Sequence, residues 1–103
     1  MHPARPHPPV PDIDILRHHA LSSTDARHAA ERVAERLRRE YRVRAEWAGD
    51  RLRVSGKGIR GELALLPDAV HLTASLGLVM RPFRNQLHHA IERELDRALP
   101  HPA

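Results

Sequence analysis

The spacing of apolar and polar positions changes twice along the chain, and these changes predict the order of its elements. Residues 12–17 alternate polar and apolar side chains, which is typical of a half-buried strand. Residues 23–41 then carry apolar side chains at helical spacing, which predicts an amphipathic helix. Ser22 and Asp25 stand where a capping box places its first and last residues. The pattern therefore predicts a strand over residues 12–17 followed by a helix over residues 23–41.

Strict alternation returns after this helix and predicts four more strands, over residues 43–47, 51–54, 59–65 and 70–76. Turns of a few residues, rich in glycine and aspartate, separate them. Such short turns can join only antiparallel neighbours, because parallel neighbours need a long crossover. One side of each strand is apolar and the other polar, so we expect the sheet to be covered on one face only.

A second amphipathic helix is predicted over residues 79–99, with Pro82 near its first turn and Pro100 ending it. The whole pattern predicts an α+β fold in the order β-α-β-β-β-β-α. It has an antiparallel sheet of about five strands, with two helices packed on one face. We expect these side chains to form the core: Leu37, Leu63, Leu72, Phe83, Leu87 and Ile91.

Length and composition limit the number of domains and the setting of the protein. A chain of 103 residues suffices for one domain, which we place at residues 12–100. Residues 1–11 are rich in proline and histidine, and we expect them to form a disordered arm. The chain has no cysteine, and no apolar stretch approaches the roughly 20 residues of a membrane-spanning helix. These features favour a cytoplasmic bacterial protein without a membrane span.

The formal charge of +4 raises the question of nucleic-acid binding. Lys57 is the only lysine, and the arginines of the first helix alternate with Glu31, Glu35 and Glu40. Such mixed charge is typical of a solvated helix face with ion pairs one turn apart. Aromatic residues that could stack on bases are also scarce. A nucleic-acid-binding regulator is therefore the weakest of the functions considered.

No segment carries a complete catalytic, cofactor or metal motif. His88 and Glu92 lie one helical turn apart, but two ligands without a third make a poor metal site. Residues 55–58, Ser-Gly-Lys-Gly, lack the spacing of a phosphate-binding loop. We therefore predict that the protein is not an enzyme and needs no cofactor or metal.

Two carboxylates stand out, because Glu40 and Glu94 each fall near the middle of an apolar helical stripe. If both reach the core, they are candidates for acid–base chemistry. The alternative, which we favour, is that each lies beyond the sheet or pairs with an arginine such as Arg36 or Arg44.

Trp47, Met80 and Phe83 are candidates for an interaction surface. Trp47 is in phase with the apolar side of its strand, which favours the core or its rim. Met80 and Phe83 begin the last helix, where they belong either to the core, which we favour, or to the mouth of a pocket. An apolar strip left exposed after folding would suit a homodimer or an apolar partner surface.

Four segments carry a family resemblance. They are residues 21–27 (Leu-Ser-Ser-Thr-Asp-Ala-Arg), 34–37 (Ala-Glu-Arg-Leu), 47–52 (Trp-Ala-Gly-Asp-Arg-Leu) and 58–63 (Gly-Ile-Arg-Gly-Glu-Leu). With a closing helix rich in Ile, Glu and Leu, they resemble the polyhydroxyalkanoic acid system family, also described as the polyhydroxyalkanoate granule-region family. The resemblance covers about residues 12–99.

The resemblance implies a small accessory protein whose gene lies near genes of bacterial polyester storage. Its implied partner is the polyhydroxyalkanoate granule or a granule protein, and it supplies no catalytic residues to carry over. A second hypothesis comes from the shape alone, because a sheet gripping a C-terminal helix can hold an apolar ligand. A closed apolar pocket of several hundred Å³ would support that helix-grip-like alternative.

Overall fold

A computed structural model describes residues 11–100 of the chain. The elements follow the predicted order, with one additional short helix before the last one. Their bounds are β1 (Ile13–His18), α1 (Ser23–Tyr41), β2 (Arg44–Ala48), β3 (Arg51–Gly56), β4 (Ile59–Leu66), β5 (Ala69–Leu76), the 3₁₀-helix η1 (Arg81–Phe83) and α2 (Arg84–Ala98). The predicted N-terminal arm lies outside the described residues except for Pro11.

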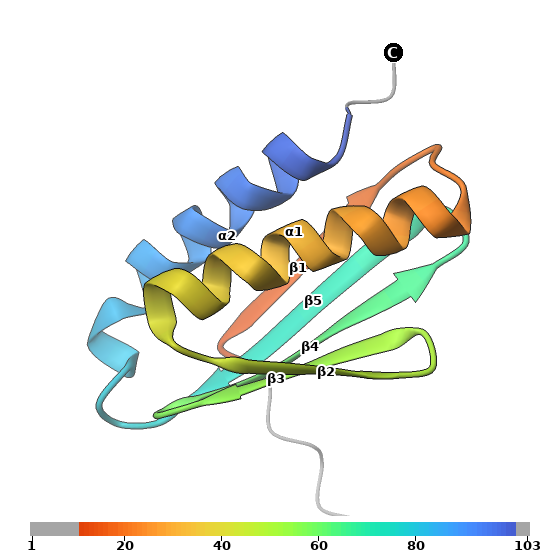
Figure 1. Ribbon diagram of the computed structural model, residues 1–103. Helices are drawn as coiled ribbons and strands as arrows, with labels where there is room; N and C mark the ends of the chain where they lie inside the picture. Colours follow the sequence, from red (N-terminus) through yellow and green to blue (C-terminus); the bar gives the residue numbers. More distant parts are fainter. Residues whose placement is uncertain (1–10, 101–103) are drawn as a thin grey trace, which may run out of the picture.

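The strands form one antiparallel sheet in the order β1-β5-β4-β3-β2. Strands β2 to β5 are neighbours in sequence, as their short turns require, while β1 pairs with β5 at the opposite edge. Figure 1 shows both helices on one side of this sheet. The α+β fold with one covered face is therefore confirmed.

Helix α1 has the bounds that the sequence predicts, and both of its ends are capped. The Ser22 hydroxyl accepts a hydrogen bond from the Asp25 backbone N–H at 3.1 Å, which satisfies one of the free donors of the first turn. At the other end Arg42 adopts a left-handed conformation with φ 52°. Its N–H donates to the Arg38 carbonyl at 2.9 Å, and the chain then turns into β2.

The second helix begins later than predicted. Residue 79 lies in a turn, η1 covers Arg81–Phe83, and α2 starts at Arg84. Residues 78–80 form a turn, and Pro82 lies in the first turn of η1, where its missing N–H costs no helical hydrogen bond. A 3₁₀-helix has about three residues per turn, so the side chains of η1 do not continue the apolar stripe of α2.

The core lies between the sheet and the two helices. Most of the predicted core residues are buried, with relative exposures of 8% or less. They are Leu37, Leu63, Leu72, Leu87 and Ile91. The prediction for Phe83 is wrong, since 47% of this residue is exposed. Its place in η1 turns it off the ridge that Leu87 and Ile91 continue.

The other face of the sheet is not covered by a helix (Figure 1). Its central row runs across the strands as Glu46, Arg53, Glu62, Thr73 and Asp14. Charges of opposite sign thus stand opposite one another, an arrangement that stabilises cross-strand pairs. This face is consistent with the polar half of the alternation in the sequence.

Candidate interaction surface

The two glutamates that fall in apolar stripes lie at the junction of α1 and α2, where one arginine contacts both. Arg36 Nε lies 2.9 Å from Glu40 Oε1 and 3.3 Å from Glu94 Oε1. Arg97 of α2 contacts the same oxygen of Glu94, also at 3.3 Å. The arginine pairing that the sequence analysis favoured is therefore present.

The exposure of Glu40 agrees with the favoured interpretation, in which it lies beyond the sheet or pairs with an arginine. Its side chain is 45% exposed, although helical periodicity places it in the apolar stripe. Glu40 lies in the last turn of α1, where it pairs with Arg36. Glu94 is more enclosed, with 17% of its side chain exposed.

Trp47 is half-buried on β2, and an arginine of α1 covers its ring. The guanidinium carbon of Arg27 lies 4.0 Å from the ring centroid, within the range of a cation–π contact. The same guanidinium donates to the Gly49 carbonyl at 2.9 Å and lies 3.7 Å from Asp50. Arg27 thus joins α1 to the β2–β3 turn, and Trp47 packs against the core.

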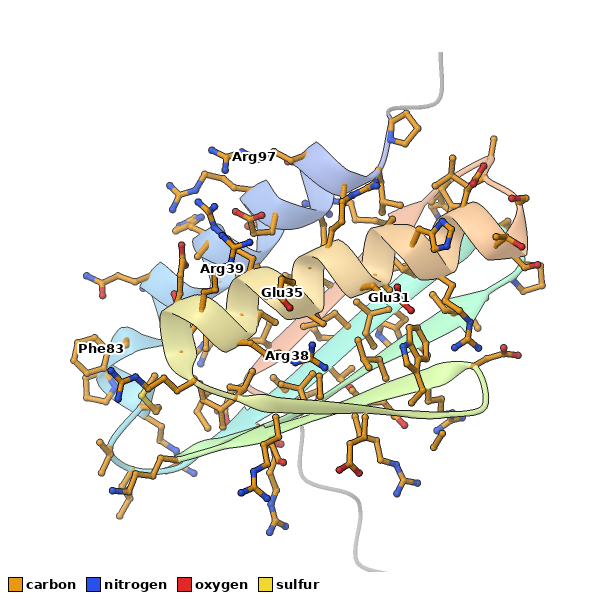
Figure 2. The ribbon with its side chains drawn as sticks, in the orientation of Figure 1. Glu31, Glu35, Arg38, Arg39, Phe83 and Arg97 are labelled. Carbon is orange, nitrogen blue, oxygen red and sulfur yellow. The ribbon has the colours of Figure 1, made fainter. Side chains whose placement is uncertain are left out.

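The turn after β5 and the helix η1, which carry Met80 and Phe83, lie at the end of the molecule where α1 ends and α2 begins, at the left of Figure 1. With Tyr41, Gln86 and Leu87 these two residues line an open hollow of about 250 Å³. Figure 2 shows Phe83 projecting outward from this end. The sequence left two interpretations open, the core or the mouth of a pocket. Phe83 lies at the mouth of the hollow, while Met80 packs partly against the core.

Two neighbouring side chains extend this surface, and the sequence analysis missed them. Leu78 is 81% exposed and Val79 is 80% exposed. We call Leu78, Val79, Met80 and Phe83 the apolar end. The available signal was the unbroken apolar run from Leu78 to Met80 after Gly77, because three consecutive residues cannot all lie on the buried side of an amphipathic helix. Periodicity alone treats such residues as the start of a buried stripe.

The histidines of α2 lie around a carboxylate that is already paired. Glu92 Oε2 accepts a hydrogen bond from Arg17 Nη2 at 2.8 Å, while Glu92 Oε1 lies 3.0 Å from His88 Nε2 and 3.6 Å from His89 Nδ1. The hydrogen bond from Arg17 lowers the pKa of Glu92, and the two histidines act in the same direction. Among residues 11–100, no group of three or more His, Cys, Asp or Glu side chains is arranged to hold a metal ion.

The space between sheet and helices is small. It amounts to about 30 Å³ and has an apolar lining that includes Gly61, Ala74, Leu87 and Ile91. A pocket for an organic ligand usually measures roughly 300–1,000 Å³. This space fits a water-sized molecule, so it gives no support to the helix-grip-like alternative.

The arginine-rich helix has the mixed charge that its sequence predicts. Arg38 and Arg39 approach the two oxygens of Glu35 at 3.4 and 3.7 Å. Figure 2 shows these residues and Glu31 along α1.

Within the described part of the chain, no helix is long and apolar enough to cross a membrane.

Fold and surface together define a small α+β protein with a one-sided antiparallel sheet and an exposed apolar end. The sequence profile of a family described as "putative polyhydroxyalkanoic acid system protein" matches residues 13–99. The chain belongs to this family, which confirms the resemblance seen in its turns and helix faces. Neither the curated proteins nor the solved structures contain a significant match to the chain.

Proposed function

We propose that the protein is a non-enzymatic accessory protein of the bacterial polyhydroxyalkanoate storage system. In the cytoplasm it attaches to the polyester granule, or to a protein on the granule, through its apolar end. The observation that carries this proposal is the exposure of Leu78 and Val79, at 81% and 80%. Exposed apolar clusters on a folded protein mark sites of contact with another surface.

The non-enzymatic part of the proposal is supported by the pairing of the candidate acidic groups. Glu40 and Glu94 both contact Arg36, and Glu92 contacts Arg17. A general acid or base must be free to reach a substrate proton. Carboxylates held by arginines in this way are better suited to joining elements of the fold.

Fractionation of cells with and without stored polyester tests the proposal. The full chain, carrying a tag, is produced under both conditions, and the granules are separated on a density gradient. We expect the protein to accompany the granules and to remain in the supernatant of cells that lack them. A protein that stays in the supernatant under both conditions would contradict the proposal.

A further inference from the structure

The turn that carries the apolar end is held firmly by backbone hydrogen bonds. The Gly77 carbonyl accepts from the N–H groups of Met80 and Arg81, both at 3.0 Å, and the Gly77 N–H donates to the Gly58 carbonyl at 2.9 Å. Leu78 and Val79 therefore project from a fixed turn. A surface that binds through them need not first order a loose segment.

Positive charge surrounds this turn. Arg81 and Arg84 follow it directly, and both are exposed. Lys57 is exposed in the β3–β4 turn beside it. The two turns touch, because a Cβ built on Gly58 would lie 2.8 Å from Met80 Cγ. We call Lys57, Arg81 and Arg84 the basic rim.

Negative charge is sparse near the basic rim. The sequence has no Asp or Glu between Asp68 and Glu92. Two acidic residues belong to segments that reach this end, and only one of them pairs with a cation. Asp12 accepts a hydrogen bond from the Leu76 backbone N–H at 2.7 Å, and Glu40 pairs with Arg36. Asp12 keeps its negative charge, and the three cations of the basic rim outnumber it beside the apolar end.

We propose that the apolar end and the basic rim together bind an anionic phospholipid surface. Leu78 and Val79 enter the apolar layer beneath the headgroups, while Lys57 and Arg84 lie at the level of the lipid phosphates. Two adjacent projecting aliphatic side chains suit a fluid layer, which needs no preformed groove, and the cations select a negatively charged one. This inference deepens the proposed function, on which it rests, by naming the chemistry of the surface bound.

Sedimentation with lipid vesicles tests the inference on the purified full chain. We expect binding to vesicles of phosphatidylcholine mixed with phosphatidylglycerol at low salt. Binding weakens as salt is added, and pure phosphatidylcholine vesicles bind much less protein. Absence of binding to the mixed vesicles at low salt, or equal binding to both kinds, would overturn the inference.

Two double variants locate the binding surface. Leu78→Ser with Val79→Ser, and Lys57→Gln with Arg84→Gln, should each weaken binding to the mixed vesicles by more than about tenfold. Arg81 is left unchanged because its Nε donates to the Leu76 carbonyl at 3.3 Å. If neither variant weakens binding while thermal melting shows both to be folded, the inference is wrong.

Matched controls make the same chemical changes elsewhere. Leu16→Ser with Leu66→Ser alters two leucines that are 47% and 43% exposed away from the apolar end. Arg93→Gln with Arg97→Gln removes the same charge from later turns of α2. Neither control should change vesicle binding. Loss of binding in either one would show that vesicles bind at another surface and would overturn the inference.

The outcomes separate this inference from the proposed function. If the protein accompanies granules in cells but does not bind anionic vesicles, the proposed function stands and the lipid surface is wrong. If it binds the vesicles through the apolar end but never accompanies granules, the lipid surface stands and the proposed function fails.

Discussion

Two turns hold a residue in the left-handed backbone conformation. At these positions the backbone conformation determines which residue types are favoured. Arg42 and Gly49 both have positive φ angles, 52° and 62°. A left-handed conformation costs a residue with a Cβ roughly 1–2 kcal/mol and costs glycine very little. Gly49 in the β2–β3 turn is therefore a favoured residue for its conformation, whereas Arg42 after α1 is a disfavoured one.

Exchanging residue types at these two positions should have opposite effects. Arg42→Gly should raise the free energy of unfolding by about 0.5–1 kcal/mol, since relief of strain exceeds the added freedom of the unfolded chain. Gly49→Ala should lower it by about 1 kcal/mol, although a Cβ there would meet no atom within 4 Å. Urea unfolding of both variants measures the difference. Equal effects at the two positions would contradict this explanation.

Burial distinguishes two residues that the helical pattern places on one ridge. Leu87 is 2% exposed and Phe83 is 47% exposed. Leu87→Ala should therefore cost about 2–5 kcal/mol, since it leaves a cavity in the core. Phe83→Ala should cost much less. Thermal or chemical unfolding compares them, and an unchanged melting curve for Leu87→Ala would disprove its place in the core.

At the scale of elements, charged side chains join helices and strands that the apolar core brings together. Arg17 on β1 contacts Glu92 and Asp96 on α2, at 2.8 and 3.4 Å. Arg36 on α1 contacts Glu94 on α2. Because these pairs are partly exposed, each contributes little to the free energy of unfolding. Their main effect is on the orientation of α2 relative to its neighbours.

The Arg17–Glu92 pair predicts a dependence on pH. The pKa of Glu92 is lowered in the folded protein, so its ionisation stabilises the fold above the ordinary carboxyl pKa of about 4.3. That stabilisation is lost as the pH falls through the lowered folded value. Arg17→Met should return the pKa of Glu92 toward the ordinary range, as carboxyl NMR titration would show. A control variant, Arg93→Met, should leave it lowered. An unchanged pKa in Arg17→Met would show that Arg17 is not the cause.

Periodicity predicted the elements well because most of them follow regular geometry. Alternation found the five strands, and the Ser22 cap located the start of α1. It misplaced the start of α2, because residues 78–80 form a turn and Arg81–Phe83 a 3₁₀-helix whose side chains follow another period. The pairing of β1 with β5 is non-local, so no short stretch of sequence encodes it.

The candidate surface was predictable only in part, for a related reason. Met80 and Phe83 attracted attention as apolar residues at the start of a helix. Leu78 and Val79 did not, because helical periodicity assigns apolar residues to a buried side. Their exposure depends on how the turn after β5 packs against Gly58, a contact between distant segments.

At the scale of the whole molecule, the fold separates two kinds of surface. The uncovered face of the sheet carries mixed charge, and the apolar end collects exposed aliphatic side chains beside cations. A protein attached through this end would leave the sheet face in contact with water. Membership of a polyhydroxyalkanoic acid system family makes the polyester granule the surface to test.

The most direct test of attachment through the apolar end is the granule-bound fraction of three proteins in polyester-storing cells. These are the wild type, Leu78→Ser with Val79→Ser, and the control Leu16→Ser with Leu66→Ser. Burying an aliphatic side chain is worth roughly 1.5–3 kcal/mol. Loss of Leu78 and Val79 should therefore lower the binding constant at least about tenfold. The control should bind as the wild type does. Equal granule-bound fractions for all three proteins would contradict attachment through this end.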